Sequence, residues 1–255
     1  MPAPLNPFKA ALAEGKMQYG CWAGFADAYA TEIVASANFD WLVIDGEHAP
    51  NTLHTIMAQL AVLDGKISHP VVRLPVGNEW LVKQVLDAGA QTLLIPMVDS
   101  AQQAREMARA MLYPPQGIRG SGAALARASR FSDIADYTTT ANDQMCLLVQ
   151  VETMAGINAL DDILAVDGVH GVFIGPADLA ADMGHLGNSN ALEVQQTIKS
   201  ALAKIAASPK AAGILATDHK TALTYRDWGA QFLAVGIDVT MLAQTARATM
   251  ARWRD

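Results

Sequence analysis

The stretch DWLVIDGEHAP, residues Asp40–Pro50, begins as an apolar run and ends in charged residues around a glycine. The run Trp41–Ile44 consists of residues that favour β-structure, so it predicts a short buried strand. Asp45, Gly46 and His48 follow at its end. A buried strand that delivers an acid and a histidine is typical of active sites in α/β enzymes, and the alternative is an ordinary polar loop.

The same order of elements, a short β-rich run followed by a longer helical run, recurs along the chain. Eight strands that alternate with helices predict a single (β/α)₈ TIM-barrel domain over residues 1–255, and a doubly wound open sheet is the alternative. The predicted strands are Tyr19–Ala23, Trp41–Asp45, Pro70–Leu74, Thr92–Pro96, Met145–Glu152, Val169–Ile174, Ala212–Thr217 and Phe232–Gly236.

Apolar residues at helical spacing predict helices between these strands. Ser100 with Gln103 resembles a capping box that opens one of them. The segment Tyr113–Gln144 is too long for a simple connection; it contains GIRGSG at Gly117–Gly122, and we expect a short helix near residues 132–140. The other helices are expected near residues 7–14, 53–63, 81–88, 100–114, 194–205 and 239–253.

The composition excludes several classes of protein. Of the 255 residues 51% are hydrophobic and 17% charged, which supports a large core and argues against disorder. A net charge of −7 argues against nucleic acid or an anionic membrane as the main partner. The chain shows no long apolar span and no secretory signal, and Cys21 with Cys146 cannot form a disulfide framework. We therefore expect a reduced, cytoplasmic protein.

Polar and aromatic residues gather where the predicted strands end. In a (β/α)₈ barrel the active site lies at the C-terminal ends of the strands, so these residues are expected to share one site. They are Trp22, Asp45 with His48, Arg73, Gln150 with Glu152, and the turn Gly175–Asp178, which reads GPAD.

Glu152 and Asp178 are the candidate metal ligands, because each is an acid that follows an apolar β-run. Two carboxylates from adjacent strands suit a hard divalent cation such as Mg²⁺ or Mn²⁺. The remaining coordination positions would be open to water and substrate, so the ion could act as a Lewis acid on a chelating 2-oxo acid. The alternative is that one or both carboxylates cap a helix, as Asp178 could for a helix over residues 179–183.

His48 is the candidate general base, because Asp45 could hold one ring nitrogen and fix the tautomer. Arg73 lies within a predicted strand, where a buried cation needs either a carboxylate or a substrate oxygen that becomes an enolate. The N–H groups of Ala177 and Asp178 at a helix start could bind a carboxylate. No lysine lies within a predicted strand, which argues against a Schiff-base aldolase.

The chain resembles the metal-dependent (class II) pyruvate aldolases, the family of 4-hydroxy-2-oxoheptanedioate aldolase and 2-dehydro-3-deoxyglucarate aldolase. The resemblance rests on segments that span nearly the whole chain, among them DWLVIDGEHAPN, VVRLP, KQVLDAGAQTLLIPMVDSAQQA, YPPQGIRG, LLVQVET and GVFIGPADLA. It implies a barrel with a swapped C-terminal helix, assembled as a hexamer (a trimer of dimers). It also implies a divalent metal, Mg²⁺, Mn²⁺ or Co²⁺, and no organic cofactor.

The resemblance also implies roles for individual residues. His48 would be the proton acceptor with Asp45 as its partner, and Arg73 would stabilise the enolate. Asp87 would raise the basicity of the histidine and can come from a neighbouring subunit. Glu47 receives no role. Glu152 and Asp178 would bind the metal; Gln150, Gly175, Pro176, Ala177 and Asp178 would contact the oxo acid; Trp22 and Leu215 would line the pocket.

The expected reaction is the reversible retro-aldol cleavage of a 4-hydroxy-2-oxo acid, such as 4-hydroxy-2-oxoheptanedioate, to pyruvate and an aldehyde. His48 would take the proton of the C4 hydroxyl, the C3–C4 bond would break, and the metal and Arg73 would hold the pyruvate enolate. Two alternatives remain at this stage. One is a related barrel lyase that acts on acyl-CoA thioesters, and the other is a non-catalytic barrel that binds an oxo acid.

Overall fold

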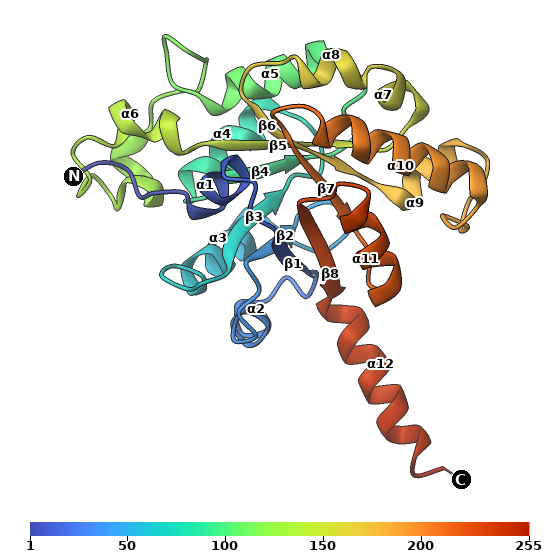
Figure 1. Cartoon of the computed structure of the whole chain (residues 1–255). Coiled ribbons are helices and arrows are strands. Elements are labelled where there is room, and N and C mark those ends of the chain that lie inside the picture. Colours follow the sequence, from blue (N-terminus) through green and yellow to red (C-terminus); the bar gives the residue numbers. More distant parts are fainter. Residues whose placement is uncertain (255) are drawn as a thin grey trace.

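Eight parallel strands close into a barrel in the computed structural model, which describes residues 1–254 (Figure 1). Strands that follow one another in sequence are neighbours in the barrel, and β8 pairs with β1. The predicted barrel is confirmed, and the open-sheet alternative is wrong. The strands are β1 (Gln18–Ala23), β2 (Trp41–Asp45), β3 (His69–Arg73), β4 (Thr92–Ile95), β5 (Cys146–Val151), β6 (Val169–Ile174), β7 (Ala211–Leu215) and β8 (Phe232–Ile237).

The strand β2, which carries the opening motif, is buried along its whole length. Its pairing with β3 sets Asp45 directly opposite Arg73. Because both residues end their strands, a carboxylate and a guanidinium lie side by side at the C-terminal edge of the barrel. The predicted bounds of β2 and β6 agree with the structure, and the other six strands differ by one or two residues at one or both ends.

The helices form a layer outside the barrel. Ser100 caps one of them as predicted, with its hydroxyl accepting from the N–H of Gln103 at 3.2 Å. The helices that the spacing predicted are α1 (Pro7–Ala13), α3 (Leu53–Val62), α4 (Glu79–Asp87), α5 (Ala101–Met111), α10 (Leu192–Ala206) and α12 (Asp238–Ala251). Helices that it missed, or anticipated only in part, are α2 (Ala28–Ala35), α7 (Met154–Asn158), α8 (Leu160–Leu164), α9 (Pro176–Asp182) and α11 (His219–Asp227).

The long segment between α5 and β5 folds into short turns rather than a long helix. It contains the 3₁₀ turns Ala123–Leu125, Arg127–Ser129 and Ala141–Gln144, and the four-residue helix α6 (Tyr137–Thr140). The helix expected near residues 132–140 therefore forms only in its last turn.

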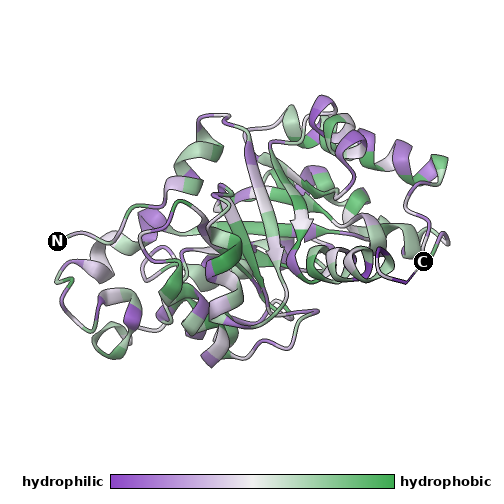
Figure 2. Cartoon of the chain, turned by 90° about the horizontal axis from the view of Figure 1, so that it is seen from below, coloured by the Kyte–Doolittle hydropathy of each residue, from purple (hydrophilic) through white to green (hydrophobic). Residues whose placement is uncertain are grey.

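The N-terminal end of the barrel is closed by α1. The ring of Phe8 lies 5.8 Å from that of Trp41 and 6.1 Å from that of Phe232, and it stacks on His69 at 5.7 Å. Seen from below, hydrophobic colouring concentrates on the central strands, whereas the outer helices also carry hydrophilic residues (Figure 2). These aromatic rings fill the N-terminal end of the barrel. The polar residues Asp45 and Arg73 lie at the opposite end.

The C-terminal helix α12 projects away from the barrel (Figure 1). It exposes Val239, Met241, Leu242 and Met250, and Trp253 beyond its end is exposed as well. The expected swap of this helix between subunits stays a prediction. No helix within residues 1–254 is both long enough and apolar enough to cross a membrane.

Candidate active site

Arg73 is the centre of the charged cluster at the C-terminal edge. It donates from Nε to Asp45 Oδ1 at 2.9 Å and from Nη2 to Asp45 Oδ2 at 2.6 Å. Its Nη1 lies 2.7 Å from Glu47 Oε2. The buried arginine therefore has two carboxylate partners, one of which is the Glu47 that received no role from the sequence.

Asp45 holds the loop that follows β2. Its Oδ1 accepts from the backbone N–H of Glu47 at 2.9 Å and of His48 at 3.3 Å, so the loop turns back over the carboxylate. Burial alone would raise the pKa of Asp45, but the hydrogen bonds and charge of Arg73 outweigh it and keep the pKa below its usual value. The carboxylate therefore stays ionised.

The side chain of His48 is exposed at this loop. Within residues 1–254 no hydrogen bond joins its ring to Asp45, whose carboxylate accepts instead from Arg73, from Trp22 and from two backbone N–H groups. The expected contact is thus corrected: Asp45 holds the backbone of His48 and not its imidazole. The ring remains free to accept a proton from another molecule.

Trp22 forms one wall of the site. Its Nε1 donates to Asp45 Oδ2 at 3.3 Å, and the guanidinium of Arg73 lies 5.2 Å from the ring centre. The ring also packs against Phe173 at 5.5 Å. Leu215, at the end of β7, packs against the same interior cluster.

Glu152 lies buried immediately after β5, with 1% of its surface exposed. Its Oε1 accepts from the N–H of Met97 at 2.9 Å, and its Oε2 accepts from Nε2 of Gln150. Burial raises the pKa of Glu152, and the nearby charge of Asp178 adds to the effect against the hydrogen bonds from Gln150 and Met97. A buried acid of this kind binds a cation more readily than it carries an uncompensated charge.

Gly175 lets this carboxylate approach β6. A Cβ at this glycine would lie 2.8 Å from Cβ of Glu152, and Glu152 Oε2 would be closer still. It would also lie 3.2 Å from Nε2 of Gln150. The glycine of GPAD is therefore needed at this position, because any side chain there would displace Glu152.

Asp178 lies in the first turn of α9, which begins at Pro176. The alternative in which Asp178 caps a helix over residues 179–183 is wrong, since the N-cap position is Gly175 and it makes no side-chain capping bond. The exposed carboxylate is thus not used as a cap. The N–H groups of Ala177 and Asp178 belong to the first turn, where the helix itself supplies no acceptor.

The side chains around Glu152 determine which kind of metal ion could bind there. Within the described residues no three His, Cys, Asp or Glu side chains form a cluster that could enclose a metal. The charge of Asp178 raises the pKa of Glu152, and Oε1 of Gln150 is buried without a hydrogen-bond partner. Two carboxylates with an unpaired amide oxygen fit an open divalent-metal site rather than a closed zinc site.

Asp87 does not join this cluster within the chain. It ends α4, and a helix that packs antiparallel to the strands returns to the N-terminal end of the barrel. There its Oδ1 accepts from Nη2 of Arg119 at 2.7 Å. Arg119, from the GIRGSG loop, is fully buried over Tyr113, with 4.4 Å between the guanidinium carbon and the ring centre.

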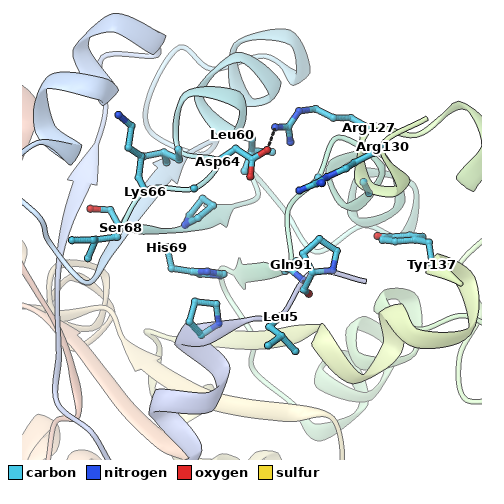
Figure 3. A pocket seen from close by; sticks show the side chains of 18 of the residues that line it. Leu5, Leu60, Asp64, Lys66, Ser68, His69, Gln91, Arg127, Arg130 and Tyr137 are labelled. Atoms are coloured by element: carbon cyan, nitrogen blue, oxygen red, sulfur yellow. Dashed lines mark hydrogen bonds and ion pairs between the residues drawn. The ribbon is translucent and has the colours of Figure 1, made fainter. Parts of the chain in front are cut away.

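A separate cavity of about 480 Å³ opens at the N-terminal end of the barrel (Figure 3). His69 at the start of β3 lies on its wall, and Arg127 and Arg130 lie across from it. Arg127 pairs with Asp64 at 3.4 Å. The cavity lies at the opposite end from Glu152 and is not the predicted site.

Glu47 and Asn51 are the residues of this region that the sequence left without a role. Both lie in the stretch DGEHAPN, so their place in the motif was a usable signal. Glu47 is half-buried against Arg73, and burial raises its pKa against the attraction of that cation. Asn51 donates from Nδ2 to the carbonyl of Asp45 at 2.7 Å.

Comparisons with known proteins identify the family of this chain. A model of the HpcH/HpaI aldolase/citrate lyase family matches residues 18–245. Over 254 residues the chain is 72% identical to a hydroxypyruvate/pyruvate aldolase of Roseovarius nubinhibens, which covers 100% of this chain and 99% of that protein. Over 248 residues it is 53% identical to a 4-hydroxy-2-oxo-heptane-1,7-dioate aldolase of Escherichia coli, covering 97% of this chain and 95% of that protein.

A solved structure from Burkholderia cenocepacia, described as a protein of the same family, superposes with a TM-score of 0.94 at 37% identity and covers 98% of this chain and 100% of its own. The matches confirm the resemblance drawn from the motifs. The chain belongs to the HpcH/HpaI aldolase/citrate lyase family.

Proposed function

We propose that this protein is a divalent-metal-dependent aldolase that cleaves 4-hydroxy-2-oxo acids to pyruvate and an aldehyde, and catalyses the reverse addition. One observation carries the proposal: at the C-terminal end of the barrel Asp45 and Glu47 pair with Arg73, whereas the neighbouring acids Glu152 and Asp178 form no ion pair within the described residues. Burial raises the pKa of Glu47 and Glu152, whereas Asp45 is held ionised by Arg73. This excess of acidic groups suits a bound divalent cation.

Glu152 and Asp178 would hold the metal, with Mg²⁺, Mn²⁺ and Co²⁺ as the candidate ions. When bound, the ion supplies Lewis-acid stabilisation of the developing enolate. The N–H groups of Ala177 and Asp178 at the start of α9 would bind the carboxylate of the oxo acid. Gln150, Gly175 and Pro176 would shape the same end of the pocket, and Trp22 and Leu215 its walls.

Arg73 keeps part of its hydrogen-bonding capacity. A guanidinium has five N–H donors, and two of them are used in hydrogen bonds to Asp45, whereas the contact with Glu47 is an ion pair without a hydrogen bond. The remaining donors would stabilise the enolate oxygen. The free ring of His48 would take the proton of the C4 hydroxyl as the C3–C4 bond breaks, and protonation at C3 would then give pyruvate.

The strands argue against an imine mechanism. None of the eight strands contains a lysine, so no amine projects from the barrel wall to form a Schiff base. The names of the relatives favour pyruvate as one product, and the 72% identical relative adds hydroxypyruvate as a second donor to be tested.

A pyruvate-release assay tests the proposal. A panel of 4-hydroxy-2-oxo acids is incubated with the protein in excess chelator and after addition of Mg²⁺, Mn²⁺ or Co²⁺, with a CoA thioester as the competing substrate class. We expect turnover of the oxo acids only with metal. Full activity in chelator, trapping of an imine by borohydride, or cleavage of the thioester alone would overturn the proposal.

We also propose that Asp87 acts on His48 of another copy in a hexamer. Its place at the N-terminal end of the barrel separates it from the exposed His48 of its own chain. The apolar residues that α12 exposes provide a surface for assembly. Co-expression of the His48→Ala and Asp87→Asn chains tests this: mixed assemblies should regain activity that neither variant has alone, and no recovery would refute it.

A further inference from the structure

The helix α3 carries a fully buried polar side chain next to the His48 loop. Gln59 is 0% exposed, whereas its buried neighbours on the helix, Ile56 and Leu60, are apolar. Burying an amide is unfavourable unless its donors and acceptor are all paired. Its contacts should therefore show what the glutamine does there.

Every polar atom of Gln59 is engaged. Its Nε2 donates to Asn51 Oδ1 at 2.7 Å and to the carbonyl of Thr55 at 3.0 Å. Its Oε1 accepts from the hydroxyl of Thr31 at 2.9 Å, and Thr31 is itself buried on α2. The amide therefore links two helices to Asn51, the last residue of the motif DGEHAPN.

Asn51 carries the link to the end of β2. Its Nδ2 donates to the carbonyl of Asp45 at 2.7 Å, and its Oδ1 also accepts from the hydroxyl of Thr55 at 2.8 Å. Asp45 in turn accepts from the N–H of His48 with its carboxylate. The loop that carries His48 is thus held at both ends, by Asp45 before it and by Asn51 after it.

We propose that Gln59 is a positioning residue, which acts through Asn51 to hold the His48 loop in its reactive conformation. The proposal rests on the role of His48 in the proposed function. The exposed imidazole has no hydrogen-bond partner of its own within residues 1–254, so its place depends on the backbone of the loop. A fully paired amide network is rigid, and an apolar residue at position 59 would fill the same space without directing Asn51.

The test is the substitution Gln59→Met, which keeps the length of the side chain and removes the hydrogen bonds. We expect kcat for pyruvate release to fall about tenfold, which corresponds to about 1.4 kcal/mol, while Mn²⁺ affinity and KM stay within twofold. Hydrogen–deuterium exchange should become about tenfold faster in the peptide that covers residues 46–51. The matched control is Ile56→Ala, a buried apolar change on the same helix, which should lower the melting temperature without either effect.

Two further variants keep the test decisive. Thr31→Val removes the hydroxyl that holds Oε1 of Gln59, keeps the shape, and should change kcat and exchange in the same direction if Gln59→Met fails to fold. In the double variant Asn51→Ala/Gln59→Met, kcat should be no lower than in Asn51→Ala alone, because Gln59 acts through Asn51.

The outcomes separate the two proposals. A wild-type protein that releases no pyruvate refutes the proposed function, and the exchange measurement then still decides on Gln59. Unchanged exchange in residues 46–51 of folded Gln59→Met or Thr31→Val overturns the positioning role. Equal losses of kcat in Gln59→Met and Ile56→Ala, measured well below their melting temperatures, overturn it as well.

Discussion

The substitution Gly175→Ala tests the proposed metal site with a single methyl group. The backbone at Gly175 has a φ of −90°, which alanine adopts without strain, so the effect of the change is steric. The new Cβ would lie 2.8 Å from Cβ of Glu152 and closer to its Oε2. Because ordinary carbon contacts lie at about 3.5–4.0 Å, the Glu152 side chain must move by about 1 Å.

A displacement of Glu152 by about 1 Å is large for a residue of an active site. A shift of about 1 Å can lower turnover by about 100-fold, and loss of support around a metal ligand lowers metal affinity by about 10–100-fold. We expect both effects in Gly175→Ala, with a melting temperature close to that of the wild type. Mn²⁺ titration by calorimetry and the pyruvate-release assay measure them.

The matched control is Gly77→Ala. There the new Cβ would meet only the side chains of Ile95 and Met107, at 3.1 and 3.3 Å, and the site should be unaffected. If Gly175→Ala binds Mn²⁺ and turns over substrate as Gly77→Ala does, Glu152 is not the metal ligand and the steric reasoning fails.

Three further predictions follow from the same structure. In Arg73→Lys a single ammonium cannot form the two bonds to Asp45, so kcat/KM for pyruvate release should fall about 100-fold; wild-type kinetics would contradict this. Burial lowers the pKa of His69 to about 4, so the unfolded state binds more protons between pH 6.5 and 4 and stability should fall by about 3 kcal/mol as the pH drops through that window. Urea unfolding at pH 7 and pH 4.5 measures the loss, which His69→Gln should reduce but not abolish, because burial also lowers the pKa of His170 to about 4. Leu242→Asp with Met250→Asp should dissociate the assembly in light-scattering experiments, and an unchanged mass would exclude α12 from the interface.

The strands could be predicted from the sequence because strands buried on both faces are continuous apolar runs. One face of each strand packs in the barrel interior and the other against the helix layer, so both faces carry apolar residues. A stretch such as Trp41–Ile44 is therefore readily identified as a buried strand. The helices α7 and α8 are five residues each, too short to show a helical period. The helix α2 is preceded by its N-cap Asp27, but it exposes Tyr29 and Ile33, so its apolar residues do not lie on one face.

The location of the site could also be predicted, because the ends of parallel strands meet at one edge whatever the helices do. The partners within the site could not. From the sequence a carboxylate was one expected partner of Arg73, without a signal for which one, and the structure pairs it with Asp45 and Glu47. Which carboxylate pairs with Arg73 depends on how the loop after β2 turns. The hydrogen bond from the N–H of Glu47 to Asp45 Oδ1 sets that turn.

The pair Asp45–Arg73 connects the chemistry of the site to the register of the barrel. The two residues stand opposite each other in the β2–β3 ladder, and both are buried. A slip of one residue would turn one of them away from the other and leave a buried charge without its partner, at a cost of about 3–5 kcal/mol. The hydrogen bonds between Arg73 and Asp45 therefore also disfavour the wrong pairing of two apolar strands. A conservative change such as Arg73→Lys, which keeps the charge and weakens the geometry, should accordingly reduce activity more than it reduces stability.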